Sequence, residues 1–276
     1  MIVKKIISLV LSLTMLCVAT SCVKSNVNVT SDGVKTEATS DETGFSAGIS
    51  FDTKVESNVN ISTSDFETIK FGKQNGKDIE WLVLSEEEDG SNFLLSKDVL
   101  LAAPYEASEE PVQYIESSLC DFLNSSFIED VFSDEERIKM IYINGEERDS
   151  EVGDAFVTLI GINTLKDLYG DLYYESENFY GSKEYFHPNK DIVAKPTTGA
   201  IDTKVNVFDN EKFAFDSETV TDTRYDFATG NSPYWLFDNT DDGLSAAFVT
   251  ATGYINYASH NAEDMGVRPL IRIRND

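Results

Sequence analysis

Residues 114–143 read YIESSLCDFLNSSFIEDVFSDEERIKMIYI and carry the clearest helical periodicity in the chain. In the first half of this stretch, apolar side chains recur at helical spacing and polar side chains lie between them. That pattern predicts an amphipathic helix with one buried face. The residues of the predicted face are Ile115, Leu119, Phe122, Leu123 and Phe127.

A second helix is expected directly after the first. Ser133 and Glu136 have the spacing of a capping box, in which each side chain satisfies a free backbone amide of the first turn. Ile138 and either Met140 or Ile141 would supply the apolar side of this helix. The two helices indicate how the chain packs, and they indicate no reaction.

The N-terminus has the pattern of a bacterial lipoprotein signal. Lys4 and Lys5 precede an apolar run that is short for a membrane span, and small residues lead into Cys22. A cysteine in this position receives a lipid and becomes the first mature residue. We therefore expect residues 1–21 to be removed and Cys22 to anchor the protein on the extracytoplasmic face of the cell membrane. An ordinary signal peptide cut nearby, or an uncleaved signal anchor, is the alternative.

Residues 22–64 are expected to form the lipidated cysteine and a flexible tether. The segment is rich in Ser, Thr, Asn, Asp and Val and contains no tryptophan, so it cannot bury enough apolar surface to fold alone. A flexible coil of about 40 residues spans roughly 35 Å. As an alternative, residues 48–59 would add a strand to the domain that follows.

The remaining residues, 65–276, have the length of one domain with a sizeable core. The formal net charge of the whole chain is −27, which excludes nucleic acid as a natural partner because phosphate binding requires clustered Lys and Arg. After loss of Cys17 and lipidation of Cys22, Cys120 is the single remaining thiol, so no intrachain disulfide can form. We expect Cys120 to be a semi-buried, inert thiol.

Strand patterns dominate the rest of the chain. Residues 66–71 and 79–84 read as a hairpin around a turn at residues 73–77, and the last strand at 266–274 alternates as a half-buried strand does. A short helix is expected at residues 163–170, with Asn163 as its N-cap and Gly170 as its stop. Together these elements predict an α+β domain. The other expected strands lie at residues 91–96, 154–162, 234–237, 246–250 and 254–257.

The segment 171–226 lacks a sustained helical or alternating pattern and yet is rich in aromatic residues. Long irregular segments in compact domains are often functional, and aromatic faces stack on sugars or peptides. The alternative is that these rings only hold a long loop against the core. The candidate ligand-binding residues are Tyr173, Tyr174, Glu175, Asn178, Tyr180 and Tyr185.

Hard oxygen ligands surround a glycine turn at residues 238–243, DNTDDG, where Asp238, Asp241 and Asp242 are weak candidates for calcium ligands. The turn lacks the spacing of a helix-loop-helix calcium site, so we expect a solvated turn and no cofactor. His187 and His260 lie far apart in sequence and outside any zinc motif. The chain also has no nucleophile elbow, phosphate loop or dinucleotide fingerprint, so we assign no catalytic residue.

Four short motifs occur in order: WLVL at 81–84, SSLCDFLN at 117–124, YWL at 234–236 and GVRP at 266–269. Together they resemble a bacterial domain family of unknown function that is common in secreted and lipid-anchored proteins. That family is similar to the C-type-lectin-like fold shared with formylglycine-generating (sulfatase-modifying) enzymes. The resemblance implies a mixed antiparallel sheet with two or three helices, pairing of the first and last strands, and long loops that carry the site.

The chain departs from this family pattern at three positions. Cys120 and Phe237 stand where the family commonly has arginine, and Phe122 stands where it commonly has tryptophan. The two missing cations argue against an anion site carried over from the family, and the cysteine pair of the formylglycine-generating enzymes is absent.

We therefore expect a non-catalytic binding module for a glycan, a cell-wall fragment or a protein. Two alternatives stay open. One is a carboxylate-dependent hydrolase acting on cell-wall or glycan substrates, which would require two acids facing one cleft. The other is a structural component of a surface assembly, which would require a broad exposed apolar patch.

Overall fold

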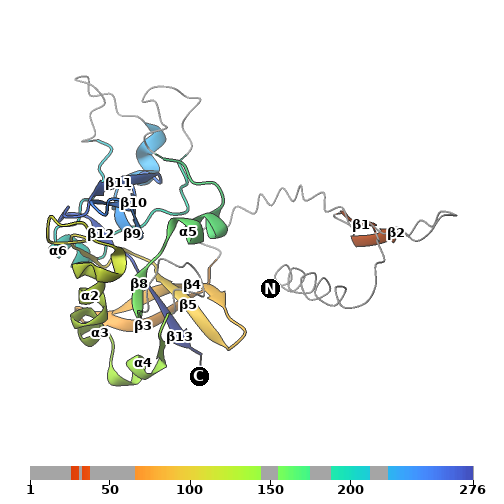
Figure 1. The fold of residues 1–276 in the computed structure, drawn as a ribbon, viewed down its shortest axis with the longest axis horizontal. Helices are drawn as coiled ribbons and strands as arrows, with labels where there is room; N and C mark the ends of the chain where they lie inside the picture. Colours follow the sequence, from red (N-terminus) through yellow and green to blue (C-terminus); the bar gives the residue numbers. More distant parts are fainter. Residues whose placement is uncertain are drawn as a thin grey trace. The chain divides into compact units, whose positions relative to one another are not determined.

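The computed structural model describes residues 26–30, 33–37, 66–143, 155–174, 188–211 and 223–275 (Figure 1). The chain divides into two compact units, Met1–Ser57 and Asn58–Asp276. In the first unit, β1 (Asn26–Thr30) and β2 (Gly33–Glu37) pair as an antiparallel hairpin inside the segment expected to be a tether. Cys22 and residues 48–59 lie outside the described residues. No helix in the described part of the chain is long and apolar enough to cross a membrane.

The second unit contains two sheets, and the first sheet is built on a meander. It comprises β3 (Thr68–Gln74), β4 (Lys77–Glu86) and β5 (Ser91–Ser96), in antiparallel order. Asn75 and Gly76 both have positive φ, 51° and 74°, so the hairpin predicted around them is confirmed. The remaining strands of this sheet are β7 (Met140–Ile141), β8 (Val157–Leu159) and β13 (Pro269–Arg274).

The second sheet has the order β11-β10-β9-β12-β6. Its pairs are antiparallel except for β12 and β9, which run parallel. The predicted strands near residues 234, 246 and 254 are therefore confirmed. The strands are β6 (Leu101–Ala102), β9 (Tyr234–Asn239), β10 (Ser245–Val249), β11 (Ile255–Ser259) and β12 (Gly266–Val267).

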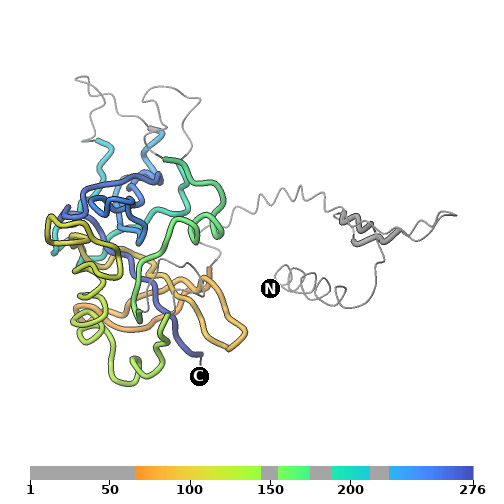
Figure 2. Tube along the Cα trace, viewed as in Figure 1, coloured from red at the N-terminus to blue at the C-terminus, as the bar shows by residue number. Residues whose placement is uncertain are grey.

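The expected long helix is divided into three short pieces: η2 (Tyr114–Glu116), α2 (Ser118–Asn124) and α3 (Ser126–Val131) (Figure 2). Ser117 has an extended backbone, and its hydroxyl accepts a hydrogen bond from the Cys120 amide at 3.1 Å, so a new helix begins there. This break changes the buried face. Leu119, Leu123 and Phe127 are buried as predicted, whereas Ile115 is 41% exposed and Phe122 is 37% exposed, so their assignment to the buried face was wrong.

The capping box is confirmed at the start of α4 (Asp134–Lys139). The Ser133 hydroxyl accepts from the Glu136 amide, and the Glu136 carboxylate accepts from the Ser133 amide at 2.9 Å. The other carboxylate oxygen of Glu136 accepts from the Gly72 amide at 2.8 Å, which ties α4 to β3. Ile138 is 76% exposed, contrary to the prediction, because polar bonds rather than an apolar face hold this helix.

Helix α5 (Ile162–Tyr169) ends at Gly170, whose φ of 79° confirms the predicted stop. Asn163 is not its N-cap. The N-cap is Gly161, and the Asp238 carboxylate accepts from the Ile162 amide at 2.8 Å. A Cβ at Gly161 would lie 2.3 Å from a ring carbon of Phe237, so only glycine lets the helix start this close to β9.

The predicted half-burial of the last strand was wrong, because β13 is buried on both faces. β13 pairs with β5 on one side and with β7 and β8 on the other. Leu270 packs in one core cluster and Ile271 and Ile273 pack in another, so both faces of the strand are covered. Arg272 is buried with them, and Arg274 at the end of the strand is exposed. Arg268, which links β12 to β13, is 1% exposed. It donates to the carbonyls of Ser96 (2.8 Å) and Ile192 (3.2 Å) and to the Tyr234 hydroxyl (3.1 Å). β13 pairs with β5 rather than with the first strand of this unit, β3.

Both tryptophans of the motifs WLVL and YWL lie in the core, and the predicted burial of Cys120 is confirmed. Trp81 and Trp235 are fully buried, and their indole nitrogens donate to the carbonyls of Phe71 and Ala103. Cys120 is a free, buried cysteine, and burial raises the pKa of its thiol. The unit is thus an α+β domain with mainly antiparallel sheets and short helices.

Candidate functional site

Two of the predicted ligand-binding residues, Tyr173 and Tyr174, lie beside the edge strand β11. The Ile255 amide donates to the Tyr173 carbonyl at 2.9 Å, and Tyr174 forms a parallel bridge with Ile255. The Tyr174 ring stacks on the Tyr257 ring, with centroids 6.4 Å apart and planes within 3°. Tyr173 is 36% exposed and Tyr257 is 41% exposed. We call Tyr173, Tyr174 and Tyr257 the tyrosine surface.

Tyr257 is the member of this surface that the sequence analysis missed, since it was counted only as part of a strand. Strand alternation indicates that Tyr257 shares a face with Ile255 and Ser259, but no sequence signal pairs it with Tyr174. Burial raises the pKa of the Tyr257 hydroxyl, and the neighbouring Tyr174 and Asp238 add to the effect. The hydroxyl therefore stays protonated at neutral pH and can donate a hydrogen bond. The other predicted residues, Glu175, Asn178, Tyr180 and Tyr185, lie outside the described residues.

The turn at residues 238–243 uses its acidic side chains within the fold. Asp242 accepts from the Thr240 hydroxyl at 2.6 Å and from the Leu244 amide at 3.1 Å, and these bonds lower its pKa. Asp238 accepts from the start of α5. Within the described ranges no group of three or more His, Cys, Asp or Glu side chains could hold a metal ion, so the weak calcium expectation for Asp238, Asp241 and Asp242 gains no support.

His260 belongs to the same corner of the molecule. It is buried, and its Nδ1 lies 3.0 Å from the carbonyl oxygen of Gly243. The Gly243 carbonyl also accepts from the Val112 amide at 3.1 Å. These contacts give the histidine a structural role, as expected. His187 lies outside the described residues.

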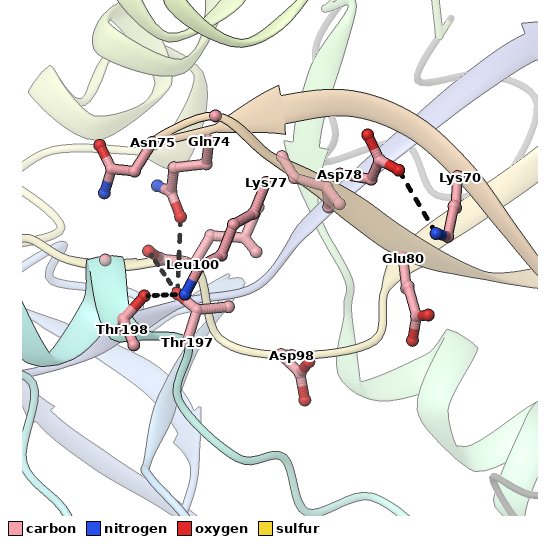
Figure 3. A pocket seen from close by; sticks show the side chains of 13 residues that line it. Lys70, Gln74, Asn75, Lys77, Asp78, Glu80, Asp98, Leu100, Thr197 and Thr198 are labelled. Carbon is pink, nitrogen blue, oxygen red and sulfur yellow. Dashed lines mark hydrogen bonds and ion pairs between the residues drawn. The ribbon is translucent and has the colours of Figure 1, made fainter.

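A cleft of about 550 Å³ lies between the β3–β4 hairpin and the start of α6 (Thr198–Asp202) (Figure 3). The sequence analysis did not predict it, because three segments distant in the chain form its walls. Its lining mixes polar and apolar groups and carries both signs of charge. The lining residues are Lys70, Gln74, Asn75, Gly76, Lys77, Asp78, Ile79, Glu80, Asp98, Leu100, Thr197, Thr198 and Gly199.

Backbone and threonine contacts hold the cleft walls together. The Val99 amide donates to the Lys195 carbonyl, and the Thr197 amide donates to the Val99 carbonyl, both at 2.9 Å. The Thr197 hydroxyl caps α6 by accepting from the Ala200 amide, and it donates to the Leu100 carbonyl at 3.2 Å. A Cβ at Gly199 would lie 2.7 Å from the Gln74 side chain, so α6 packs closely on the hairpin. The cleft is therefore formed without a ligand.

Most charged groups of the cleft already have a partner. Lys70 pairs with Asp78 at 3.3 Å. Glu80 pairs with Lys97 at 2.6 Å, and this hydrogen bond lowers the pKa of Glu80.

Asp98 is the exception. It is half-buried, and within the described part of the chain its carboxylate makes no hydrogen bond or ion pair. Burial raises the pKa of Asp98, and the charges of Lys97 and Arg268 offset that effect only in part. Asp98 and Glu80 thus line one cleft with pKa shifts of opposite direction.

These features define an α+β domain with two surface features, a stacked tyrosine pair and a cleft lined by charged groups of both signs. Residues 89–275 match the family model described as a domain of unknown function, DUF6273. The match covers more than half of the chain, and the chain belongs to this family. Comparisons with curated proteins and with solved structures found no match. The matched region contains the tyrosine surface and Asp98, whereas the β3–β4 wall of the cleft precedes it.

Proposed function

We propose that this domain is a non-catalytic binding module of C-type-lectin-like type, and that its ligand is a glycan bound on the tyrosine surface. The observation that supports this proposal is the stacked pair of the half-buried Tyr174 and the exposed Tyr257, with the exposed Tyr173 next to Tyr174 in the chain. The apolar face of a sugar ring packs on such rings, and the tyrosine hydroxyls bond its hydroxyl groups.

The tyrosine surface is organised before any ligand binds. Backbone pairing with Ile255 fixes the position of Tyr173 and Tyr174, and β10 fixes β11 from the other side. A ligand therefore loses little affinity to the ordering of these side chains. An ordered edge strand with exposed rings is the arrangement that a small binding module requires.

The proposal places the module on the extracytoplasmic face of a bacterial cell membrane, held by a lipid on Cys22. The signal pattern in residues 1–22 supports that location. The strong acidity of the chain fits it, since a charge of −27 opposes binding to nucleic acid. Cell-wall fragments and surface proteins are the other ligands that this location offers.

A hydrolase acting on cell-wall or glycan substrates is the second candidate, and one observation favours it. Glu80 and Asp98 line one cleft, one with a lowered and one with a raised pKa, as an ionised carboxylate and a general acid require. The binding module is favoured because the Glu80 carboxylate is engaged by Lys97 at 2.6 Å and is a poor base or nucleophile in that state.

The first experiment is a screen of the purified full-length chain against arrayed glycans and cell-wall fragments, with and without calcium. We expect a specific glycan hit that Tyr174→Ala weakens. Tyr142→Ala is the matched control, because Tyr142 is also exposed and also packs on an aromatic ring, that of Phe156. Absence of any hit on folded protein would overturn the glycan proposal and direct the search to protein partners. Release of reducing sugar that depends on Asp98 would favour the hydrolase.

A further inference from the structure

The cleft between the β3–β4 hairpin and α6 is a second site with no residue in common with the tyrosine surface. Its volume, about 550 Å³, lies in the range of about 300–1,000 Å³ that is typical of small-molecule sites. Amide and hydroxyl groups on its walls, those of Gln74, Asn75 and Thr198, suit the hydroxyl groups of a sugar.

Some charged side chains of the cleft have a bonding partner, and one has none within the described residues. The two lysines of the lining are engaged, Lys70 by Asp78 and Lys77 by the Thr198 hydroxyl at 3.3 Å. Glu80 is engaged by Lys97. Asp98 is the lining carboxylate that lacks a partner within the described residues, and it is half-buried.

The positive groups near Asp98 either bond other residues or are too far from its carboxylate to form an ion pair. The Arg268 guanidinium donates to the Ser96 and Ile192 carbonyls and to Tyr234. Lys97 bonds Glu80 at 2.6 Å, and Lys195 acts on Asp98 only through its charge. A partly desolvated carboxylate is stabilised by an ammonium group that both pairs with it and donates hydrogen bonds to it.

We propose that this cleft binds a primary ammonium group, carried on a hydroxyl-rich ligand such as an amino sugar with a free amine. The ammonium pairs with Asp98, while Thr198, Gln74 and Asn75 bond the hydroxyl groups. An anionic ligand fits less well, because it would have to compete with Asp78 for Lys70 and would lie beside the unpaired Asp98. The inference does not rest on the tyrosine surface, and it holds or fails independently of it.

The test compares two probes that differ at the amines: the β-1,4-linked trisaccharide of glucosamine, and the same trisaccharide with all three amines acetylated, which removes the positive charges and adds a neutral acetyl group at each. Asp98→Asn distinguishes the effect of charge from that of the acetyl groups. Isothermal titration of the full-length chain should show that the amine form binds at least tenfold more tightly. Asp98→Asn should abolish this preference. Asp130→Asn, which removes the same charge from an exposed position on α3, should preserve it.

A pH titration keeps the proposal testable if Asp98→Asn fails to fold. The groups facing Asp98 are Lys97, Glu80, Arg268 and Lys195. Because the ammonium binds the ionised carboxylate, affinity for the amine probe should rise as pH increases through the pKa of Asp98, and affinity for the acetylated probe should not.

Several results would overturn the proposal. Equal affinity for the two probes would remove the role of the ammonium. A preference for the amine that persists in Asp98→Asn would place its site elsewhere. Cleavage of either trisaccharide would identify the cleft as catalytic. Loss of glycan binding in Tyr174→Ala with retained amine preference would separate this site from the tyrosine surface and leave the inference intact.

Discussion

Replacing Arg268 by methionine should destabilise the domain more than any change to its exposed arginines. Arg268 is 1% exposed and donates to the carbonyls of Ser96 and Ile192 and to the hydroxyl of Tyr234. Methionine keeps the apolar stem and removes the donors. The Ile192 carbonyl would still accept from the Tyr234 hydroxyl at 2.6 Å, whereas the Ser96 carbonyl and the Tyr234 oxygen would lose their charged donor. Each such loss costs about 1–3 kcal/mol, and relief from burying the charge offsets part of the total, so we expect a loss of about 2–4 kcal/mol.

The effect should extend to the cleft. Ser96 precedes the loop that carries Asp98, and Ile192 precedes the segment that carries Thr197, so Arg268 bonds the starts of two cleft walls. In Arg268→Met, amide hydrogens in both segments should exchange faster with solvent, ahead of those in β4 and β5. Arg268 therefore contributes both to the stability of the fold and to the positions of the two cleft walls.

Urea unfolding of the full-length chain, followed by circular dichroism, measures the loss directly. For a domain of this size, about 2–4 kcal/mol corresponds to a fall in Tm of roughly 4–16 °C. Arg274→Met is the control, because Arg274 ends β13, the strand that follows Arg268, and is exposed. A free energy of unfolding for Arg268→Met within about 1 kcal/mol of the Arg274→Met value would refute the role assigned to Arg268.

Three further results are expected. Gly161→Ala should cost about 1–3 kcal/mol of unfolding free energy, because the added Cβ would lie 2.3 Å from the Phe237 ring. Adding Phe237→Leu should recover part of that loss, and no recovery would contradict the steric cause. Ser133→Ala should cost about 1 kcal/mol of unfolding free energy through loss of the capping box, whereas Ile138→Ser should change it by less than about 0.5 kcal/mol. A larger loss in Ile138→Ser than in Ser133→Ala would show that α4 depends on an apolar face. Burial raises the pKa of Asp98 in the folded state, so the folded state binds its proton more tightly and this residue's contribution to stability falls as pH rises from its ordinary pKa of 3.8 to its raised pKa. Asp98→Asn should therefore gain stability relative to wild type as pH rises through this window in urea unfolding, and a constant difference would exclude the effect.

Local sequence signals predicted most of the strands and the capping box. A hairpin around Asn75 and Gly76, a capping box at Ser133 and a helix stop at Gly170 each depend on residues within a few positions of one another. All the residues that form each of these features are close together in the sequence, so the sequence alone was sufficient to predict them, and the structure confirms them.

Features that depend on tertiary contacts were mispredicted. The periodicity of residues 115–127 is helical, but the Ser117 cap starts a new helix and turns Ile115 towards solvent. The alternation of the last strand indicates one buried face, but separate core clusters cover its two faces, one containing Leu270 and the other Ile271 and Ile273. Asn163 is a good cap by type, yet Asp238, from a strand far along the chain, caps α5 instead.

In the candidate sites too, the sequence predicted what depends on local composition and missed what depends on tertiary contacts. The aromatic content of residues 171–226 indicated Tyr173 and Tyr174. The structure adds Tyr257, a residue of β11, because Tyr174 pairs with Ile255 of that strand and its ring stacks on the Tyr257 ring. The cleft could not be predicted, because the hairpin, the loop at Asp98 and the start of α6 meet only in the fold. In a chain this acidic, the type and position of Asp98 carry no signal; only its burial without a partner distinguishes it.

The most direct test of the binding proposal is a calorimetric titration of the full-length chain with the best glycan from the screen. Truncating one ring of the tyrosine surface removes about 1–2 kcal/mol of contact, so Tyr174→Ala and Tyr257→Ala should each weaken binding by roughly 5- to 30-fold, while Tyr142→Ala binds as wild type does. If both variants bound the glycan with wild-type affinity, the tyrosine surface would be no ligand site and the proposed function would be contradicted.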